Sequence, residues 1–400
     1  MNRNIASLAA IAQKKHRNII GLMSGTSVDG LDIALCQISG SGYETEINLK
    51  AFETIAYAPD FKAEIKEVFS KKMVDFEKLT LLNPWVALQQ SQMILSFLKK
   101  HGIDKTEVDL IASHGQTVYH APKALHGHEK FGNATLQIGD GDHIAVATEI
   151  ITISDFRQKH IAAGGEGAPL AVYGDYFIFS KKGEDRIMLN MGGIANFTFL
   201  PGSIDANKIF STDTGPGNTM MDALIQQHFP GKYFDEDASV AKQGIVNETL
   251  LRALKDHPFF QQSFPKTTGP ELFNLPYLET AKQKTGISNL SIYDTMATLN
   301  LFSAQTIAEA VQKTMHGNDS FIMYASGGGM HNPLLMQNIQ QLLPNVVIKH
   351  TSELGIHPDA KEAVLFAILA NECVAGGDVE FGKELKGIPS VTMGKISFPW

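Results

Sequence analysis

The sequence predicts an α/β protein built from two similar halves. Segments typical of strands alternate with helical segments along the chain. The strand, glycine-rich turn and strand that open the chain near residue 18 appear again from Arg186. A length of 400 residues exceeds what one hydrophobic core usually supports. The two halves have little sequence identity, and no linker rich in proline, glycine or serine separates them. We therefore expect a structural repeat whose halves pack closely.

The first half begins with strands, because β-branched and aromatic residues alternate with polar ones at 18–24, 31–39 and 48–57. Helices are expected next, over 60–72 with Asp60 as N-cap and over 74–101. Pro84 should start or interrupt the second of these helices. A short buried strand over 108–113 then leads into SHGQT, and ITISD forms a further strand.

The second half repeats this order from RIMLNMGGIANFTFLP onward. Helices dominate from Asn218 to Met315. The segment SFIMYASGGG reads as a strand, and a helix should begin at Asn332. A final helix is expected from Asp359 to about Ala375.

Composition excludes several classes of protein. The formal net charge is −8 and no basic stripe is present, so nucleic acid is not an expected partner. Cys36 and Cys373 stand alone in apolar segments, which indicates a reducing compartment without disulfides. Residues 1–17 carry their positive charges after the apolar stretch, the reverse of a secretory signal. No run approaches the roughly 18 apolar residues of a membrane span, so we expect a cytoplasmic protein with no membrane partner.

Three glycine-rich turns follow predicted strands: SGTSVDG (24–30), NMGGIAN (190–196) and SGGGMHN (326–332). Glycine lets backbone N–H groups approach an anion closely, and serine and threonine hydroxyls add donors. None fits the dinucleotide fingerprint, and the first lacks the lysine of a P-loop. One such turn could be an ordinary hairpin, but three at strand ends favour phosphate binding.

Four carboxylates are candidates for chemistry. Asp213, in STDTGPGN, should lie on a rigid loop before a helix and could act as a general base or metal partner, or could simply cap a turn. Glu362 should lie in the first turn of the last helix, where the helix dipole alone would also explain it. Asp29 and Asp32 could approach a magnesium ion, although Asp-Gly is also a hairpin signal.

Four histidines lie in SHGQTVYHAPKALHGHEKFG and lack the spacing of a zinc site, so we interpret them as core or surface residues: His114, His120, His126 and His128. A serine hydrolase is not supported, because the sequence has no Gly-x-Ser-x-Gly elbow.

Together, these segments resemble one family, the anhydro-N-acetylmuramic acid kinases. The matching motifs run in order from about Ile19 to Ala370: GLMSGTSVDGLD, HGQTVYH, LQIGDGD, DFRQKHIAAGGEGAPL, LNMGGIAN, DTGPGNTMMDA, KTTGPELFN, GGGMHNPLLM and KEAVLFAILA. The resemblance implies the two-domain actin-like or sugar-kinase fold, with duplicated ribonuclease-H-like domains and ATP in the cleft between them. The expected ranges are a flexible terminus at 1–16, an N-terminal domain at 17–160 and a C-terminal domain at 161–400, whose last segment could pack back on the first domain.

The resemblance also implies a reaction. Water opens the 1,6-anhydro ring of anhydro-N-acetylmuramic acid, and ATP phosphorylates the freed O6, giving N-acetylmuramate 6-phosphate and ADP in cell-wall recycling. Asp213 would be the base that deprotonates the water. ATP and Mg²⁺ are the implied cofactors, a small anhydro amino sugar the substrate, and a homodimer the expected assembly. Two alternatives stay open: a kinase of levoglucosan, and a non-catalytic actin- or chaperone-like ATP clamp.

By motif position, three sets of residues would form the site. The nucleotide would contact Gly25, Thr26, Ser27, Val28, Asp29, Gly30, Leu31, Asp32, Gly192, Gly193, Asn196, Gly327, Gly328, Gly329 and Asn332. The sugar would contact Thr117, Arg157, Asp213 and Glu362. The metal would lie near Asp29 and Asp32.

The chain departs from the family pattern at a few positions. Glu166 stands where glutamine is common and Pro270 where arginine is common, and DFRQKHIA keeps one arginine of a usual three. These changes affect anion contacts rather than the reaction. Residues 121–132 look like an insertion that could cover the sugar pocket.

Overall fold

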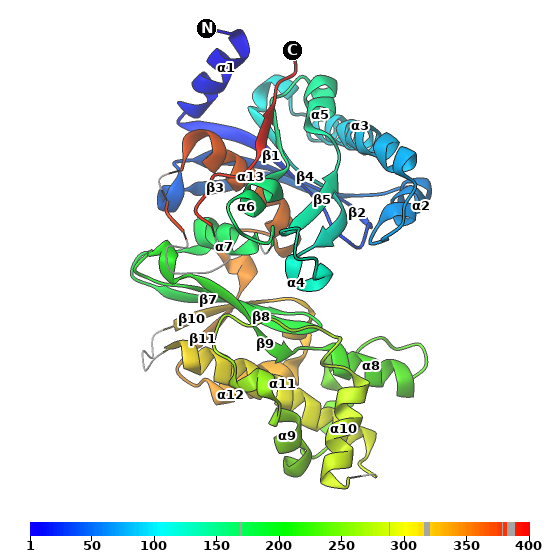
Figure 1. The fold of residues 1–400 in the computed structure, drawn as a ribbon. Coiled ribbons are helices and arrows are strands. Elements are labelled where there is room, and N and C mark those ends of the chain that lie inside the picture. The colour runs from blue at the N-terminus through cyan, green and yellow to red at the C-terminus, as the bar shows by residue number, and fades with distance from the viewer. Residues whose placement is uncertain (169, 288, 316–320, 378, 382–388) are drawn as a thin grey trace. The chain divides into compact units, whose positions relative to one another are not determined.

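The computed structural model describes residues 1–168, 170–287, 289–315, 321–377, 379–381 and 389–400. The chain forms two compact units (Figure 1). The first contains Met1–Phe179, Ala206–Lys208 and Ile356–Trp400, and the second contains Ser180–Asp205 and Ile209–Gly355. This division differs from the expected break at residue 160, and it assigns the last segment to the first unit. The domain ranges implied by the resemblance stay a prediction.

The sheet of the first unit begins with an antiparallel meander of β1 (His16–Ser24), β2 (Gly30–Ser39) and β3 (Glu46–Ala56). On the other side of β1, β4 (Leu110–Ala121) and then β6 (Thr152–Ser154) continue the sheet in parallel. Two antiparallel strands complete it: β5 (Ala134–Ile138) beside β4, and β12 (Lys395–Ser397) beside β6. The order is therefore β12-β6-β4-β1-β2-β3.

Helices pack against this sheet because its strands are apolar on both faces. Ile20 and Leu22 of β1 join a core with α2 (Pro59–Val68), α3 (Phe76–His101) and α5 (Gly141–Thr148). Gly21 points to the opposite face, where a Cβ atom would lie 1.8 Å from the carbonyl oxygen of Ala363. Ala363 belongs to α13 (Lys361–Ala375), so only glycine permits this helix to lie directly on β1.

The remaining helices of the first unit are short. They are α1 (Arg3–Ala12), α4 (Lys123–His126), α6 (Phe156–Ala162) and α7 (Ala171–Phe179). Helix α1 occupies the terminus for which the sequence predicts flexibility. Its N-cap is Asn2, whose side chain accepts a hydrogen bond from the N–H of Asn4.

The second unit repeats the first topologically. Strands β7 (Asp185–Met191), β8 (Ile194–Leu200) and β9 (Phe210–Pro216) form an antiparallel meander. Strand β10 (Phe321–Ser326) lies parallel to β7, and β11 (Val347–His350) lies parallel to β10. The strand order β11-β10-β7-β8-β9 corresponds, strand by strand, to β6-β4-β1-β2-β3 of the first sheet. Neighbouring strands also run in the same relative directions in the two sheets. The predicted duplication and α/β fold are confirmed.

Helices α11 (Ile292–Met315) and α12 (Pro333–Leu342) share one core with the second sheet. A separate apolar cluster joins the other face of α11 to α8 (Thr219–His228), α9 (Glu248–Lys255) and α10 (Leu275–Thr285). In Figure 1 these helices gather below the strands β7 to β11.

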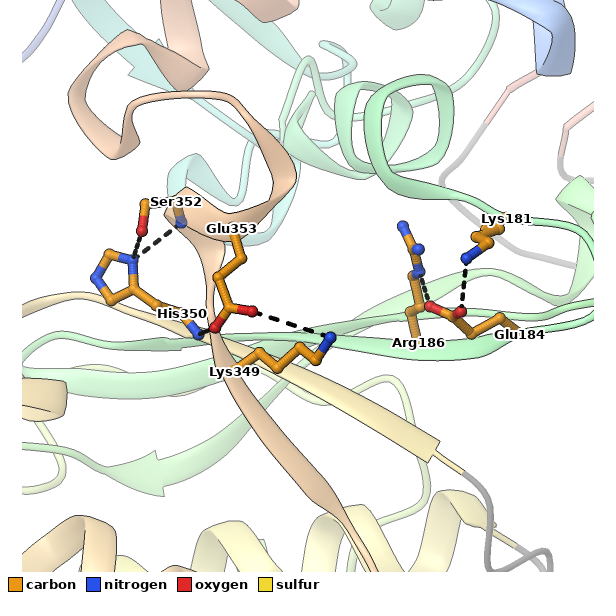
Figure 2. A network of polar contacts seen from close by, with 7 residues as sticks. All are labelled: Lys181, Glu184, Arg186, Lys349, His350, Ser352 and Glu353. Carbon is orange, nitrogen blue, oxygen red and sulfur yellow. Dashed lines mark hydrogen bonds and ion pairs between the residues drawn. The ribbon is translucent and has the colours of Figure 1, made fainter.

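Charged side chains form local contacts near two of the places where the chain passes between the units. Glu184 accepts hydrogen bonds from Lys181, at 3.0 Å, and from Arg186, at 2.6 Å (Figure 2). At the other place, Glu353 accepts from the backbone N–H of His350 and lies 3.9 Å from Lys349 Nζ. Both groups lie within seven residues of a crossing point, at Ser180 or Gly355.

Several local predictions were wrong. Pro84 lies inside α3 without breaking it, at the cost of one backbone hydrogen bond. Pro59 occupies the first turn of α2, so Asp60 is not its N-cap. Strand β4 does not end at Ser113 but continues through the HGQT residues, and the last helix begins at Lys361. In the part of the chain that the structure describes, no helix is long and apolar enough to cross a membrane.

Candidate active site

The turn between β1 and β2 holds the first glycine-rich motif. Its backbone closes through a hydrogen bond from Val28 N–H to the Gly25 carbonyl, at 3.3 Å. Val28 is buried and has a φ of +55°, which is costly for a β-branched residue. Ser27 donates to Asp29 Oδ1 at 2.8 Å, and this bond lowers the pKa of Asp29. Such backbone strain persists where surrounding structure enforces it, as at ligand-binding turns.

A β-bulge in β4 orients the side chains of His114 and Gln116. The pairing moves from Leu22↔Ser113 to Ser24↔Gln116, so β4 carries one extra residue there. Gly115 absorbs the bulge with a φ of +75°, and a Cβ atom on it would lie 2.7 Å from the Ile138 carbonyl oxygen. Beyond the bulge, Gln116 accepts from Ser24 Oγ at 2.5 Å and donates to the Gly25 carbonyl at 3.2 Å. The bulge therefore anchors the start of the β1–β2 turn.

Arg157, in the first turn of α6, is held by two acceptors. Its Nε donates to His114 Nε2 at 2.9 Å, and its Nη1 donates to the carbonyl of Gly167 at 2.6 Å. His114 is buried, and burial lowers its pKa to about 3, so its imidazole is neutral and accepts through Nε2. Among the described residues, Arg157 forms no direct ion pair. Its guanidinium is therefore held in one orientation by two neutral acceptors, while the charge of Glu362 acts on it without a direct ion pair.

Glu362, in the first turn of α13, shares the electrostatic neighbourhood of Arg157. Glu362 reaches the surface of the first unit. The protein packed around its carboxylate removes enough water to raise the pKa of Glu362. The attraction of Arg157 lowers this pKa and the repulsion of Asp32 raises it. Thr117 is half-buried on β4, where its Oγ1 accepts from Gln137 Nε2 at 3.3 Å. The first unit therefore brings Arg157, Glu362 and Asp32 together.

Asp29 and Asp32 are the two residues for which the sequence predicts a magnesium ion, and this role stays a prediction. Asp32 accepts from Thr54 Oγ1 at 2.5 Å, and its pKa is raised by burial and by the charges of Asp29 and Asp359. A cation would relieve this repulsion. No group of three or more metal-binding side chains occurs among the described residues. Mg²⁺ usually takes one or two carboxylates and fills its other positions with phosphate oxygens and water.

The second unit brings the other two glycine-rich turns beside the DTGPGN motif. The carbonyls of Gly193 and Gly192 accept from the N–H groups of Gly217, at 2.8 Å, and Asn218, at 2.9 Å. The third turn lies alongside, because Ser326 pairs with Asn190 at the ends of β10 and β7. Gly327, Gly328 and Gly329 follow directly. The two predicted turns of the second unit therefore form one cluster with DTGPGN, built on adjacent strand ends.

Asn332 has a structural role within that cluster. Its side-chain oxygen caps α12 by accepting from Leu335 N–H at 3.0 Å, and it also accepts from Asn300 Nδ2 at 3.1 Å. Asn196 lies on β8 between Asn190 and Asp213 in the strand register. Contact of these residues with a nucleotide stays a prediction.

Asp213 lies in strand β9, not on a loop as the sequence predicts. Its backbone N–H donates to the Lys266 carbonyl at 2.9 Å, and its Oδ2 accepts from Thr268 N–H at 2.8 Å. In the described chain, Oδ1 receives no hydrogen bond. The carboxylate is half-buried, which raises its pKa; Thr268 opposes this, Glu271 adds to it and Lys266 opposes it. The geometry suits a general base with one free oxygen.

Sequence reasoning missed Lys266, whose backbone carbonyl accepts the hydrogen bond from Asp213 N–H. Its side chain is buried, and Nζ donates to the Phe259 carbonyl at 2.9 Å and lies 4.1 Å from the centre of that ring. Burial and the charge of Lys313 lower its pKa to about 8, and Asp213 opposes the shift. A lysine in an aromatic neighbourhood (Phe259, Phe260 and Phe264) is the signal that could have identified it.

The other histidines of the SHGQTVYHAPKALHGHEKFG segment and Glu166 form fewer contacts with the proposed site residues. His126 is half-buried and His128 is exposed, and their rings stack with centroids 5.5 Å apart. His120 interacts electrostatically with Arg157 and with Glu166, the exposed residue that replaces the common glutamine. A cavity of about 360 Å³ in the first unit, lined in part by Lys159, Tyr173 and Glu372, contains none of the predicted site residues.

A duplicated strand topology, glycine-rich turns at the strand ends and a carboxylate with a free oxygen are features that suit a phosphoryl-transfer enzyme. A family model described as anhydro-N-acetylmuramic acid kinase matches residues 17–381. The chain is 59% identical over 400 residues to the anhydro-N-acetylmuramic acid kinase of Pseudoalteromonas atlantica, with 100% of both chains covered. It is 54% identical over 399 residues to that of Pseudoalteromonas translucida, again with 100% of both covered. The chain belongs to the anhydro-N-acetylmuramic acid kinase family.

More distant relatives agree. The anhydro-N-acetylmuramic acid kinase of Caldanaerobacter subterraneus is 36% identical over 394 residues, covering 98% of this chain and 99% of the relative. Among solved structures, a hexokinase from Schistosoma mansoni complexed with glucose has 9% identity and a TM-score of 0.36, with 88% of this chain and 85% of that chain covered. That likeness is too low to argue from. As a kinase, the protein uses ATP.

Proposed function

We propose that this protein opens the 1,6-anhydro ring of anhydro-N-acetylmuramic acid with water and transfers the γ-phosphoryl group of ATP to O6. The products are N-acetylmuramate 6-phosphate and ADP, as in the recycling of cell-wall murein. Family membership over residues 17–381 supports the substrate. The observation that carries the mechanism is Asp213, a half-buried carboxylate with one oxygen held by Thr268 and the other free.

In this mechanism Asp213 accepts a proton from water as the water oxygen bonds to C1. The bond between C1 and O6 breaks, and O6 then bonds to the γ-phosphorus as ADP leaves. Arg157 contacts an anionic or hydroxyl group of the sugar, and Glu362 hydrogen-bonds the sugar from the same side of the first unit. Because Asp213 is hydrogen-bonded on Oδ2, its free Oδ1 is oriented toward a single proton donor.

The β1–β2 turn and the turns of the second unit would contact the ATP phosphates through backbone N–H groups. Asp29 and Asp32 would hold Mg²⁺, partly through water. When bound, this ion would neutralise charge on the phosphates and help to orient them for transfer. The protein's own residues do the positioning.

Coupled measurement of ADP release tests the function. We expect turnover with anhydro-N-acetylmuramic acid, much less with levoglucosan, which lacks the acetamido and lactyl groups, and none in buffer alone. Preference for levoglucosan would contradict the proposed substrate. ADP release independent of any sugar would favour an ATP clamp. A homodimer in the cytoplasm is part of the same proposal, and the molar mass in solution tests the assembly.

A further inference from the structure

The bulge in β4 aims His114 at Arg157, and no predicted role accounts for this contact. His114 is buried, and its ring lies 4.8 Å from the ring of Phe366 on α13. Its Nε2 accepts the Nε–H of Arg157 at 2.9 Å. The Gly167 carbonyl takes a second guanidinium N–H. Among the described residues, the other three of the five donors of Arg157 have no hydrogen-bond acceptor.

We infer that His114 is a positioning residue, whose neutral imidazole fixes the Arg157 guanidinium toward the substrate without cancelling its charge. A carboxylate in the place of His114 would hold the guanidinium equally well, but it would neutralise the cation that an anionic substrate group needs. A neutral acceptor orients the guanidinium and leaves its positive charge available to the substrate. The low pKa of His114 keeps this acceptor unprotonated throughout the physiological range.

This inference rests on the proposed role of Arg157 in binding the sugar. It adds a residue that touches neither sugar nor nucleotide but acts through one that does. His114 should therefore affect sugar affinity only while Arg157 is present, and it should not affect ATP affinity.

The test is a double-mutant cycle on sugar affinity, measured by calorimetry with anhydro-N-acetylmuramic acid. His114→Phe keeps a ring against Phe366 but removes the acceptor. Loss of a hydrogen bond to a charged donor costs roughly 10- to 100-fold in affinity, so we expect a weakening of that order with ATP affinity unchanged. His114→Gln, whose oxygen can reach the position of Nε2, should stay within about threefold of the wild type. In an Arg157→Ala background, His114→Phe should have no further effect.

Asn371→Leu is the matched control. Asn371 Oδ1 accepts the Nε–H of Arg17 at 2.6 Å, so it is a second buried acceptor of an arginine Nε in the same unit. This variant should lower the melting temperature and leave sugar affinity unchanged. A purely structural role for His114 predicts one of two results: His114→Phe lowers the melting temperature without changing sugar affinity, as Asn371→Leu does, or it weakens sugar binding equally with and without Arg157. Either result would overturn the inference.

If His114→Phe does not fold, an NMR measurement on the wild-type protein tests the hydrogen bond between Arg157 and His114. The ¹⁵N signal of Arg157 Nε, identified as the one missing in Arg157→Lys, should show scalar coupling across the hydrogen bond to His114 Nε2. Absence of that coupling would refute the contact. Wild-type sugar affinity in Arg157→Ala would also overturn the inference, while sugar-dependent ADP release would leave the proposed function intact. Absence of ADP release in the wild type would instead defeat the proposed function.

Discussion

Asp213 is the residue on which the chemistry depends. Asp213→Asn keeps the shape of the side chain and can still accept from Thr268 N–H. Because asparagine cannot accept the proton of the attacking water, we expect kcat to fall by about 10²- to 10⁴-fold with little change in sugar affinity. Steady-state kinetics with calorimetry measures both. A variant with wild-type turnover and a lowered melting temperature would show instead that Asp213 has only a structural role.

Two charged neighbours should move the pH profile of kcat in opposite directions. A base must be deprotonated, so kcat falls as pH falls through the pKa of Asp213. Lys266 lowers that pKa and Glu271 raises it. We therefore expect Lys266→Met to move the acid limb to higher pH and Glu271→Gln to move it to lower pH. Shifts of the same sign in both variants would argue against Asp213 as the group that titrates.

Sequence reasoning proposed Asp213, Glu362 and Arg157 by motif, but it could not find the residues that contact them. Lys266 is 54 residues from Thr212, which accepts from its N–H, and His114 is 43 residues from Arg157. Contacts at such separations depend on strand order and on a bulge, neither of which a local pattern encodes. Burial decides the protonation of these groups, and burial too is a property of the folded chain.

At the scale of the element, the β4 bulge orients two side chains of the first unit, those of His114 and Gln116. Gly115→Ala introduces both an unfavourable φ and a clash at 2.7 Å with the Ile138 carbonyl oxygen. We expect it to destabilise the protein by more than about 1 kcal/mol and to lower activity, because His114 and Gln116 would move. Urea unfolding and kcat/KM provide the measurements.

Gly102→Ala is the control for that variant. Gly102 has a similar φ of +65°, but nothing lies within 4 Å of the position of its Cβ atom. It should show the cost of backbone strain alone and keep its activity. Equal effects of the two substitutions on activity would mean that the bulge does not orient the site.

The β1–β2 turn should determine the magnesium dependence. Replacing Asp29 and Asp32 together with asparagine removes the two negative charges that would face the ion, so we expect a higher magnesium requirement and weaker nucleotide binding. Titration of activity with MgCl₂ tests this. Glu67→Gln, an exposed change on α2, is the control and should titrate like the wild type. Unchanged magnesium dependence in the double variant would remove Asp29 and Asp32 from the metal site.

The strands that begin each half were predictable because their apolar and polar residues alternate clearly. Strand β4 was cut short in the prediction because HGQT has the composition of a loop, while the bulge lets Gly115 stay within the sheet. Asp213 was placed on a loop because its glycine and proline neighbours usually end strands. Pro84 was misjudged because proline usually ends a helix, yet α3 continues through it.

For the whole molecule, the repeated strand order is the feature in which the structure agrees best with the sequence prediction. A strand–turn–strand pattern recognised twice in the sequence corresponds to two sheets of matching order and direction. The return of residues 356–400 to the first unit could not be derived from pattern, because it depends on the close approach of α13 to Gly21. The residues proposed for the chemistry are divided between the units: Asp213 belongs to the second, and Arg157, Glu362, Asp29 and Asp32 belong to the first.

The central claim is that one protein couples ring hydrolysis to phosphorylation, and the fate of the water oxygen tests it most directly. The reaction is run in ¹⁸O-water with anhydro-N-acetylmuramic acid and ATP, and the product is quenched before anomeric exchange and analysed by mass spectrometry. The mechanism predicts one ¹⁸O atom at C1 and none in the phosphate, because O6 comes from the sugar ring. A product without ¹⁸O at C1 would contradict it.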